Sequence, residues 1–171
     1  MLEIGERVYT TAYGQGVTRS DMLHVSQAEG ATYVDDLTDA PSVPSHTYDC
    51  VIVTQTLHLI FDLDATLRTI RRILKPGGVL LCTTPGLSAI ADGDWNQTWF
   101  WMLTRRGAEE VFGRVFTADA VEVISYGNVL SATAFLQGLA SRELRPRELA
   151  VSDPEYPVIL GVVARAGDGP A

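Results

Sequence analysis

The chain has 171 residues, of which 46% are hydrophobic and 20% charged, so it suits a single folded domain and is neither disordered nor collagen-like. Its 13 basic and 21 acidic residues give a formal net charge of -8, which disfavours binding to nucleic acid or to an anionic membrane. Cys50 and Cys82 lie inside apolar runs, which indicates small buried side chains and no disulfide. No apolar stretch reaches the ~18 residues of a membrane span, and a signal-peptide pattern is lacking. We therefore predict a cytoplasmic protein.

The first half of the chain contains four candidate strands. Residues 16–20 and 31–35 are short candidates, separated by a polar stretch at 26–30 that reads as a loop or a weak helix. Residues 48–54 and 78–84 are continuous apolar runs rich in β-branched side chains, which is typical of strands buried on both faces of a parallel sheet.

An amphipathic helix is predicted between the two long strands, at residues 62–74. Apolar side chains recur there at helical spacing, Asp62 can accept hydrogen bonds from the first free amides, and Pro76 with two glycines follows the end. A strand, a helix and a strand with short connections form a βαβ unit, which requires a parallel sheet. The predicted fold class is therefore α/β.

The second half continues the same alternation. We predict a helix at 104–112, a strand at 120–125, a helix at 130–140 and a final strand at 157–164. No internal repeat or linker divides the chain, so residues 1–166 are predicted to form one domain, followed by a flexible tail at 167–171.

Three segments, at residues 48–53, 56–60 and 72–81, resemble the class I S-adenosylmethionine-dependent methyltransferases. The most specific part is Leu74-Lys75-Pro76-Gly77-Gly78. The resemblance implies a doubly wound Rossmann-like sheet of seven strands, mostly parallel with an antiparallel last strand. It also implies an enzyme that transfers a methyl group from S-adenosylmethionine to a small-molecule acceptor, which we expect to be a hydroxyl.

The resemblance assigns cofactor contacts to the first three strands. Residues 1–5 resemble the first strand, with Gly5 opening the glycine-rich motif, and residues 17–21 resemble the second. The second strand would end at Asp21, whose carboxylate would accept hydrogen bonds from both ribose hydroxyls. Asp36, with its neighbour Leu37, would receive the adenine amino group. Alternatively, both aspartates could be turn carboxylates that cap nearby amides.

Three further cofactor contacts are expected near the central strands. Thr54 and Gln55 follow the fourth strand, at the edge where open α/β sheets bind ligands. Glu3 lies between apolar residues of the first strand, so its carboxylate needs a partner when buried. That partner could be the ammonium of the cofactor's methionine moiety or a backbone amide.

His58 is the catalytic candidate, because an imidazole after the fourth strand could take the proton of an attacking hydroxyl. A structural hydrogen-bonding role is the alternative. The aromatic residues Trp95, Trp99, Phe100 and Trp101 could form a wall for a flat substrate or could close the core beneath a surface loop.

The chain departs from the family pattern near its start. Arg7 and Tyr9 replace two glycines of the Gly-x-Gly-x-Gly motif, and the 11 residues between Gly5 and Val17 leave little room for a helix. The chain also begins inside the first strand, so helices that the family places ahead of it as a lid are expected to be absent. These departures motivate a second hypothesis, a methyltransferase-fold binding or partner subunit that assembles with another protein or as a homo-oligomer. Zinc and hydrolase motifs are not present, and no metal site is predicted.

Overall fold

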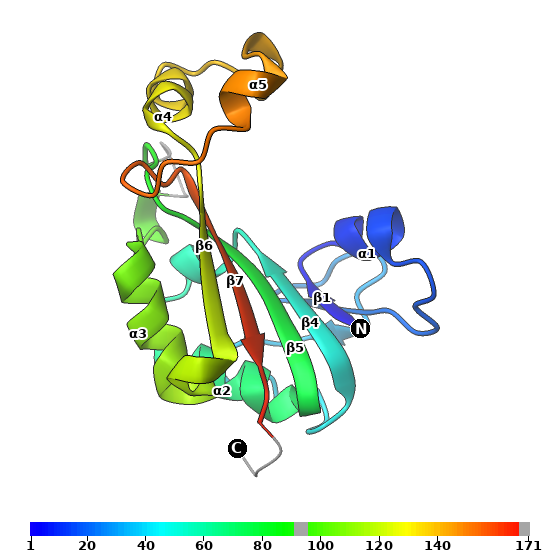
Figure 1. Cartoon of the computed structure of the whole chain (residues 1–171). Coiled ribbons are helices and arrows are strands. Elements are labelled where there is room, and N and C mark those ends of the chain that lie inside the picture. Colours follow the sequence, from blue (N-terminus) through cyan, green and yellow to red (C-terminus); the bar gives the residue numbers. More distant parts are fainter. Residues whose placement is uncertain (91–95, 168–171) are drawn as a thin grey trace.

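The computed structural model describes residues 1–90 and 96–167, which form a seven-stranded sheet flanked by helices (Figure 1). The strand order is β3-β2-β1-β4-β5-β7-β6. Neighbouring strands are parallel from β3 to β5, whereas β7 runs antiparallel to both β5 and β6, which confirms the predicted fold class. The strands are β1 (Leu2–Ile4), β2 (Asp21–His24), β3 (Tyr33–Val34), β4 (Tyr48–Thr54), β5 (Leu74–Pro85), β6 (Val121–Tyr126) and β7 (Ile159–Arg165).

Helices α2 (Leu63–Ile73) and α3 (Arg105–Phe116) pack against one face of the sheet and enclose the core. The apolar stripe of α2 is buried there, as its spacing predicts. The helix begins where Asp62 accepts a hydrogen bond from the amide of Ala65 at 2.9 Å, and two arginines lie in its last turn. The predicted βαβ unit is therefore confirmed.

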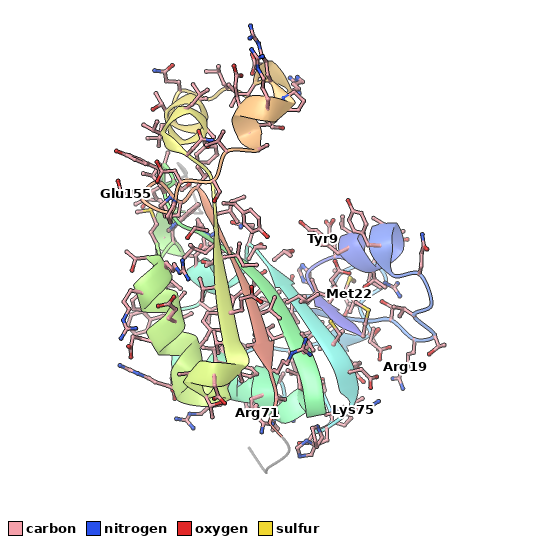
Figure 2. The ribbon with its side chains drawn as sticks, viewed as in Figure 1. Tyr9, Arg19, Met22, Arg71, Lys75 and Glu155 are labelled. Atoms are coloured by element: carbon pink, nitrogen blue, oxygen red, sulfur yellow. The ribbon has the colours of Figure 1, made fainter. Side chains whose placement is uncertain are left out.

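The opposite face of β4, β5, β6 and β7 is left open by the described helices (Figure 1). Because side chains alternate along a strand, this open face carries Ile52, Leu81, Ile124 and Val163. Leu81 pairs with both Ile52 and Val163 in the register of the strands. The short helix α1 (Val8–Tyr13) borders this face, and Leu81 remains 40% exposed. Figure 2 shows Tyr9 on α1 beside this face.

An arm between β6 and β7 extends beyond the carboxyl edge of the sheet (Figure 1). It contains α4 (Val129–Leu136) and α5 (Pro146–Leu149), with the short 3-10 helix η4 (Ser141–Glu143) between them. Asn128 joins the two helices, because its side chain caps α4 at Ser131 and donates to the carbonyls of Glu148 and Val151 at 2.8 and 2.7 Å. Two other 3-10 helices are η1 (Leu57–Leu59) and η3 (Ala118–Ala120).

The predicted second strand at 17–21 is wrong. Strand β2 begins at Asp21, which pairs with Leu2, and continues through the buried pair Met22 and Leu23. The polar residues 18–20 precede it as a connection. The other predicted strands and helices are present, β4 with the predicted ends and the rest with shifted ends, and the six-residue α1 lies in the shortened segment between Gly5 and Val17. Trp95 and the predicted tail beyond Gly167 lie outside the described residues.

Candidate functional site

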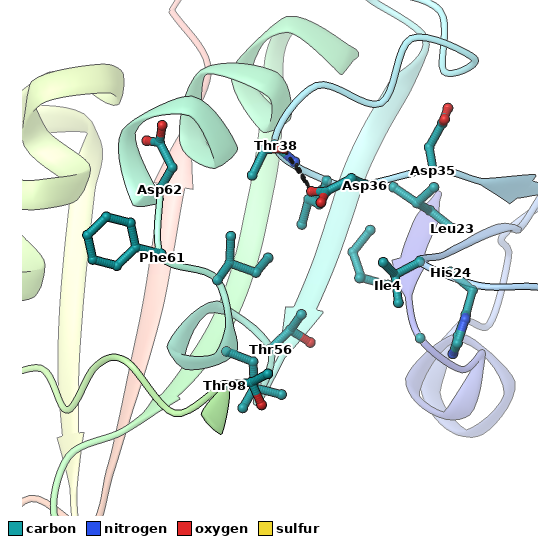
Figure 3. A pocket seen from close by; sticks show the side chains of 15 residues that line it. Ile4, Leu23, His24, Asp35, Asp36, Thr38, Thr56, Phe61, Asp62 and Thr98 are labelled. Carbon is teal, nitrogen blue, oxygen red and sulfur yellow. Dashed lines mark hydrogen bonds between the residues drawn. The ribbon is translucent and has the colours of Figure 1, made fainter. Parts of the chain in front are cut away.

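A cavity of about 600 Å³ lies at the carboxyl ends of β1, β2 and β3 (Figure 3). On its other side is the segment that follows β4. The strand order reverses direction between β1 and β4, and open α/β sheets bind their ligands at such a switch point. The cavity is lined by Ile4, Gly5, Leu23, His24, Val25, Asp35, Asp36, Leu37, Thr38, Thr56, Leu59, Ile60, Phe61, Asp62 and Thr98.

Gly5 presents open backbone to this cavity. Its φ of +91° is a conformation that favours glycine, and no heavy atom lies within 4 Å of the position that a Cβ would occupy. Its amide donates to the carbonyl of Leu23 at 2.9 Å, which fixes it beside the end of β2. A ligand can therefore approach the chain closely at Gly5, and a cofactor contact at this single glycine of the predicted motif stays a prediction.

Glu3 is a buried residue that holds the start of α1. Its side chain is 1% exposed, and its two carboxylate oxygens accept hydrogen bonds from the amides of Tyr9 and Thr10 at 2.8 and 2.9 Å. These amides belong to the first turn of α1, where backbone donors lack partners within the helix. Of the two partners predicted for Glu3, the backbone amide is confirmed, and a cofactor contact stays a prediction.

Asp36 and Leu37 line the cavity, as predicted. Asp36 also accepts hydrogen bonds from the amide and the hydroxyl of Thr38, both at 2.8 Å (Figure 3). It therefore caps its own turn while it faces the cavity, so the turn role is confirmed and the contact with the adenine amino group stays a prediction. Beside it, hydrogen bonding from the side chain and then the backbone of Ser42 holds the pKa of Asp35 below its ordinary value, which keeps this carboxylate charged.

Asp21 lies at the amino end of β2 and therefore at the opposite edge of the sheet from the cavity. Its Oδ2 accepts a hydrogen bond from the hydroxyl of Tyr48 at 2.8 Å and pairs with Arg19 at 2.9 Å. Figure 2 shows Arg19 and Lys75 on that side of the molecule. Burial raises the pKa of Tyr48, so its hydroxyl stays protonated and donates. The predicted strand at 17–21 ended at Asp21, whereas β2 begins there, so the prediction placed Asp21 at the wrong edge of the sheet. Asp21 is therefore not part of the site.

Thr54 ends β4 and Gln55 follows it, but neither is among the described residues that line this cavity. Thr54 lines a second cavity of about 410 Å³ between α1 and the open face. Gln55 has a φ of +48°, and its side-chain amide donates to the hydroxyl of Thr83 at 3.3 Å. Thr56, two residues further on, faces the first cavity instead.

His58 is buried beneath the aromatic segment. It is 5% exposed, its ring centroid lies 4.4 Å from that of Trp99, and its Nδ1 has no hydrogen-bond partner among the described residues. It is also absent from the described lining of the cavity, so a catalytic role stays a prediction that this position does not support. Trp101 donates to the carbonyl of Ile60 at 3.0 Å, which favours the interpretation that the aromatic segment closes the core.

The buried position of His58 predicts a pH-dependent stability. Burial lowers the pKa of His58, so the unfolded chain takes up this proton first as the pH falls. The contribution of His58 to the free energy of unfolding is fully present above the ordinary histidine pKa of about 6.5. It is lost as the pH falls from there through the lower pKa of His58 in the folded protein. Urea unfolding at pH 7.5 and pH 5 should show a larger loss of stability for the wild type than for His58→Phe. An equal loss in both proteins would contradict this expectation.

A methyltransferase-domain family profile matches residues 8–124. The chain belongs to the methyltransferase-domain family. The ubiquinone/menaquinone biosynthesis C-methyltransferase UbiE of Pasteurella multocida is 37% identical over 65 residues, which are 38% of this chain and 24% of that relative. The same enzyme of Escherichia coli K12 is 33% identical over 63 residues, which are 37% and 25% of the two chains. The matched segment therefore spans about a quarter of these methyltransferases.

Solved structures of S-adenosylmethionine-dependent methyltransferases share the fold. The one from Mesorhizobium loti has a TM-score of 0.61 at 17% identity, covering 96% of this chain and 89% of that chain. The one from Archaeoglobus fulgidus has a TM-score of 0.63 at 12% identity, covering 96% and 84%. The predicted family, its methyltransferase class and its cofactor, S-adenosylmethionine, are confirmed at the level of the family. In the described residues of this methyltransferase-family chain, no group of three potential metal ligands and no helix suited to crossing a membrane are found.

Several cavity residues of this methyltransferase domain were missed by the sequence analysis. His24 ends β2 and Val25 follows it, and the displacement of the strand's start from residue 17 to Asp21 concealed them. Leu59, the last residue of η1, lines the cavity together with Ile60 and Phe61, at the end of the segment 56–60 that was matched to the family and just after it. Apolar residues near the carboxyl end of a strand were the available signal for Val25 and for residues 59–61.

Proposed function

We propose that this chain transfers a methyl group from S-adenosylmethionine to a small-molecule acceptor. The observation that carries the proposal is the cavity at the switch point of the sheet, with the open backbone of Gly5 at one end and Asp36 beside β3. S-adenosylmethionine, when bound, supplies an electrophilic methyl group on a sulfonium. The chain contributes binding and orientation, and the apolar residues 59–61 exclude water.

The acceptor is proposed to be a hydroxyl, with a carbon atom as the competing outcome. A hydroxyl needs a group that takes its proton, and the cavity offers Asp35, Asp36 and Asp62 rather than His58. The relatives, however, bear the name C-methyltransferase, which favours a carbon acceptor. Both acceptors use the same cofactor cavity.

A partner-subunit function is the second candidate. The open apolar face, with Leu81 40% exposed, favours it. One structural neighbour, a putative methyltransferase of Haloferax volcanii, was solved in complex with the Trm112 methyltransferase activator. That neighbour has a TM-score of 0.57 at 17% identity, covering 97% of this chain and 81% of that chain. A partner subunit or homo-oligomer would assemble without requiring cofactor affinity.

Calorimetric titration with S-adenosylmethionine and S-adenosylhomocysteine tests the leading proposal, and light scattering on the same sample tests assembly. Methyl transfer is then followed with cofactor carrying a 13C-labelled methyl group and a panel of phenols and quinols. The 13C resonance of the product separates O-methyl from C-methyl groups. Absence of binding to either ligand would overturn the methyl-transfer proposal, and an oligomer without cofactor affinity would favour the second candidate.

A further inference from the structure

The carboxyl end of β2 carries a histidine where nucleotide-binding folds commonly place an acid. In such folds an acidic side chain at the end of the second strand accepts hydrogen bonds from the ribose. Here β2 ends at His24, and Asp21 lies at the other end of the strand. His24 lines the cavity and is adjacent to Leu23, whose carbonyl accepts from the amide of Gly5. Relative to the open glycine, His24 therefore occupies the position of the acid that contacts the ribose in such folds.

The carboxylates of the cavity come from other elements. Asp35 and Asp36 follow β3 and accept hydrogen bonds from Ser42 and Thr38, respectively. Asp62 caps α2 on the far side of the cavity. Figure 3 shows His24 near Ile4, at the opposite end of the cavity from Asp62 and Phe61. No described carboxylate of the cavity lining belongs to β2 or to the turn that follows it.

The imidazole of His24 is oriented by its own turn. Its Nδ1 lies 2.8 Å from the carbonyl oxygen and 3.1 Å from the amide nitrogen of Ser26. Because the turn engages Nδ1, the second ring nitrogen, Nε2, is the atom left for a ligand. A hydroxyl both donates and accepts, so it can bond to this nitrogen in either tautomer.

We propose that His24 takes the place of the acid and contacts one ribose hydroxyl of the adenosyl cofactor through Nε2. This inference rests on the proposed function, since it concerns the same cavity. One neutral nitrogen replaces a charged group with two acceptor oxygens, and hydrogen bonds to charged groups are stronger. The chain therefore binds the ribose less strongly than it would with a carboxylate at position 24.

Two substitutions at this position have opposite expected effects. His24→Ala should weaken binding of S-adenosylhomocysteine by roughly 2- to 10-fold, the equivalent of one neutral hydrogen bond. His24→Asp should tighten it by roughly 5- to 10-fold, because a charged acceptor replaces a neutral one. His24→Phe keeps the ring volume without the nitrogen and should behave as His24→Ala does. Asp21→Asn is the matched control, which should lower the unfolding midpoint and leave affinity unchanged.

The decisive comparison uses an analogue of S-adenosylhomocysteine that lacks both ribose hydroxyls. Titration calorimetry should give equal affinities of the wild type and His24→Ala for this analogue, while the two proteins differ for the parent ligand. Thermal unfolding of each variant checks that it is folded. A loss that persists with the analogue, or unchanged binding of the parent ligand by the His24 variants, would overturn this inference alone. If the wild type binds neither ligand, the proposed function fails and this inference fails with it.

Discussion

Glu3→Ala is expected to lower the free energy of unfolding by about 3–4 kcal/mol, because it removes two hydrogen bonds to a charged group in a buried place. The two oxygens of Glu3 bind the amides of Tyr9 and Thr10, and the side chain is 1% exposed. Without it, two part-buried amides lose their acceptor and a cavity forms beneath α1. Urea unfolding followed by circular dichroism measures the change.

The matched control is Thr104→Ala, which removes the cap of α3. Thr104 accepts one hydrogen bond, from the amide of Gly107 at 3.0 Å, at an exposed position. Its loss should cost about 1 kcal/mol, as for an ordinary helix cap. Glu3→Gln retains a single acceptor oxygen, so its loss in free energy of unfolding should lie between those of Glu3→Ala and Thr104→Ala. Equal costs for Glu3→Ala and Thr104→Ala would show that the carboxylate of Glu3 does not hold α1.

The centre of the fold was predictable because its signals are local. Strand β4 matches the predicted run at 48–54, and α2 begins at the predicted cap, Asp62. A continuous β-branched run and an amphipathic stripe each depend on residues close in sequence. The family motif at residues 74–78 then supplied the order of the sheet, which periodicity alone does not determine.

The start of β2 was not predictable in the same way. Its position depends on pairing with β1, where Asp21 aligns with Leu2 and Leu23 with Ile4. That register is fixed by burial of Met22 and Leu23 against distant parts of the chain. The predicted strand ended at Asp21, whereas β2 begins at Asp21 and ends at His24. Asp21 was therefore predicted to lie at the cavity, and His24 was missed.

His58 illustrates a second limit, the direction of side chains in a tight turn. Within η1 and its flanks, Thr56 and Leu59 face the cavity, whereas Leu57 and His58 are buried. A single 3-10 turn is too short for a repeating pattern, so its periodicity cannot indicate which side chains point inward. The chemistry of an imidazole near a strand end made His58 a candidate, and packing against Trp99 set its direction.

Gly5→Ala is expected to weaken binding of S-adenosylmethionine by roughly 10-fold or more, equivalent to at least ~1.4 kcal/mol. The added Cβ would occupy open space at the cavity, where no heavy atom lies within 4 Å. The φ of +91° also strains any residue with a Cβ, which should lower the free energy of unfolding by about 1–2 kcal/mol. Calorimetric titration and urea unfolding separate the two effects.

Gly77→Ala provides the control for backbone strain without a cavity. Gly77 has a φ of +73°, and no heavy atom lies within 4 Å of its Cβ position, but it lies in β5 near the strand's amino end. Its substitution should lower the free energy of unfolding by a similar amount and leave the affinity for S-adenosylmethionine unchanged, because Gly77 lies at the opposite edge of the sheet from the cavity. If both variants bind S-adenosylmethionine as the wild type does, Gly5 is a turn residue only. The cofactor would then have to approach this sheet elsewhere than at the end of β1.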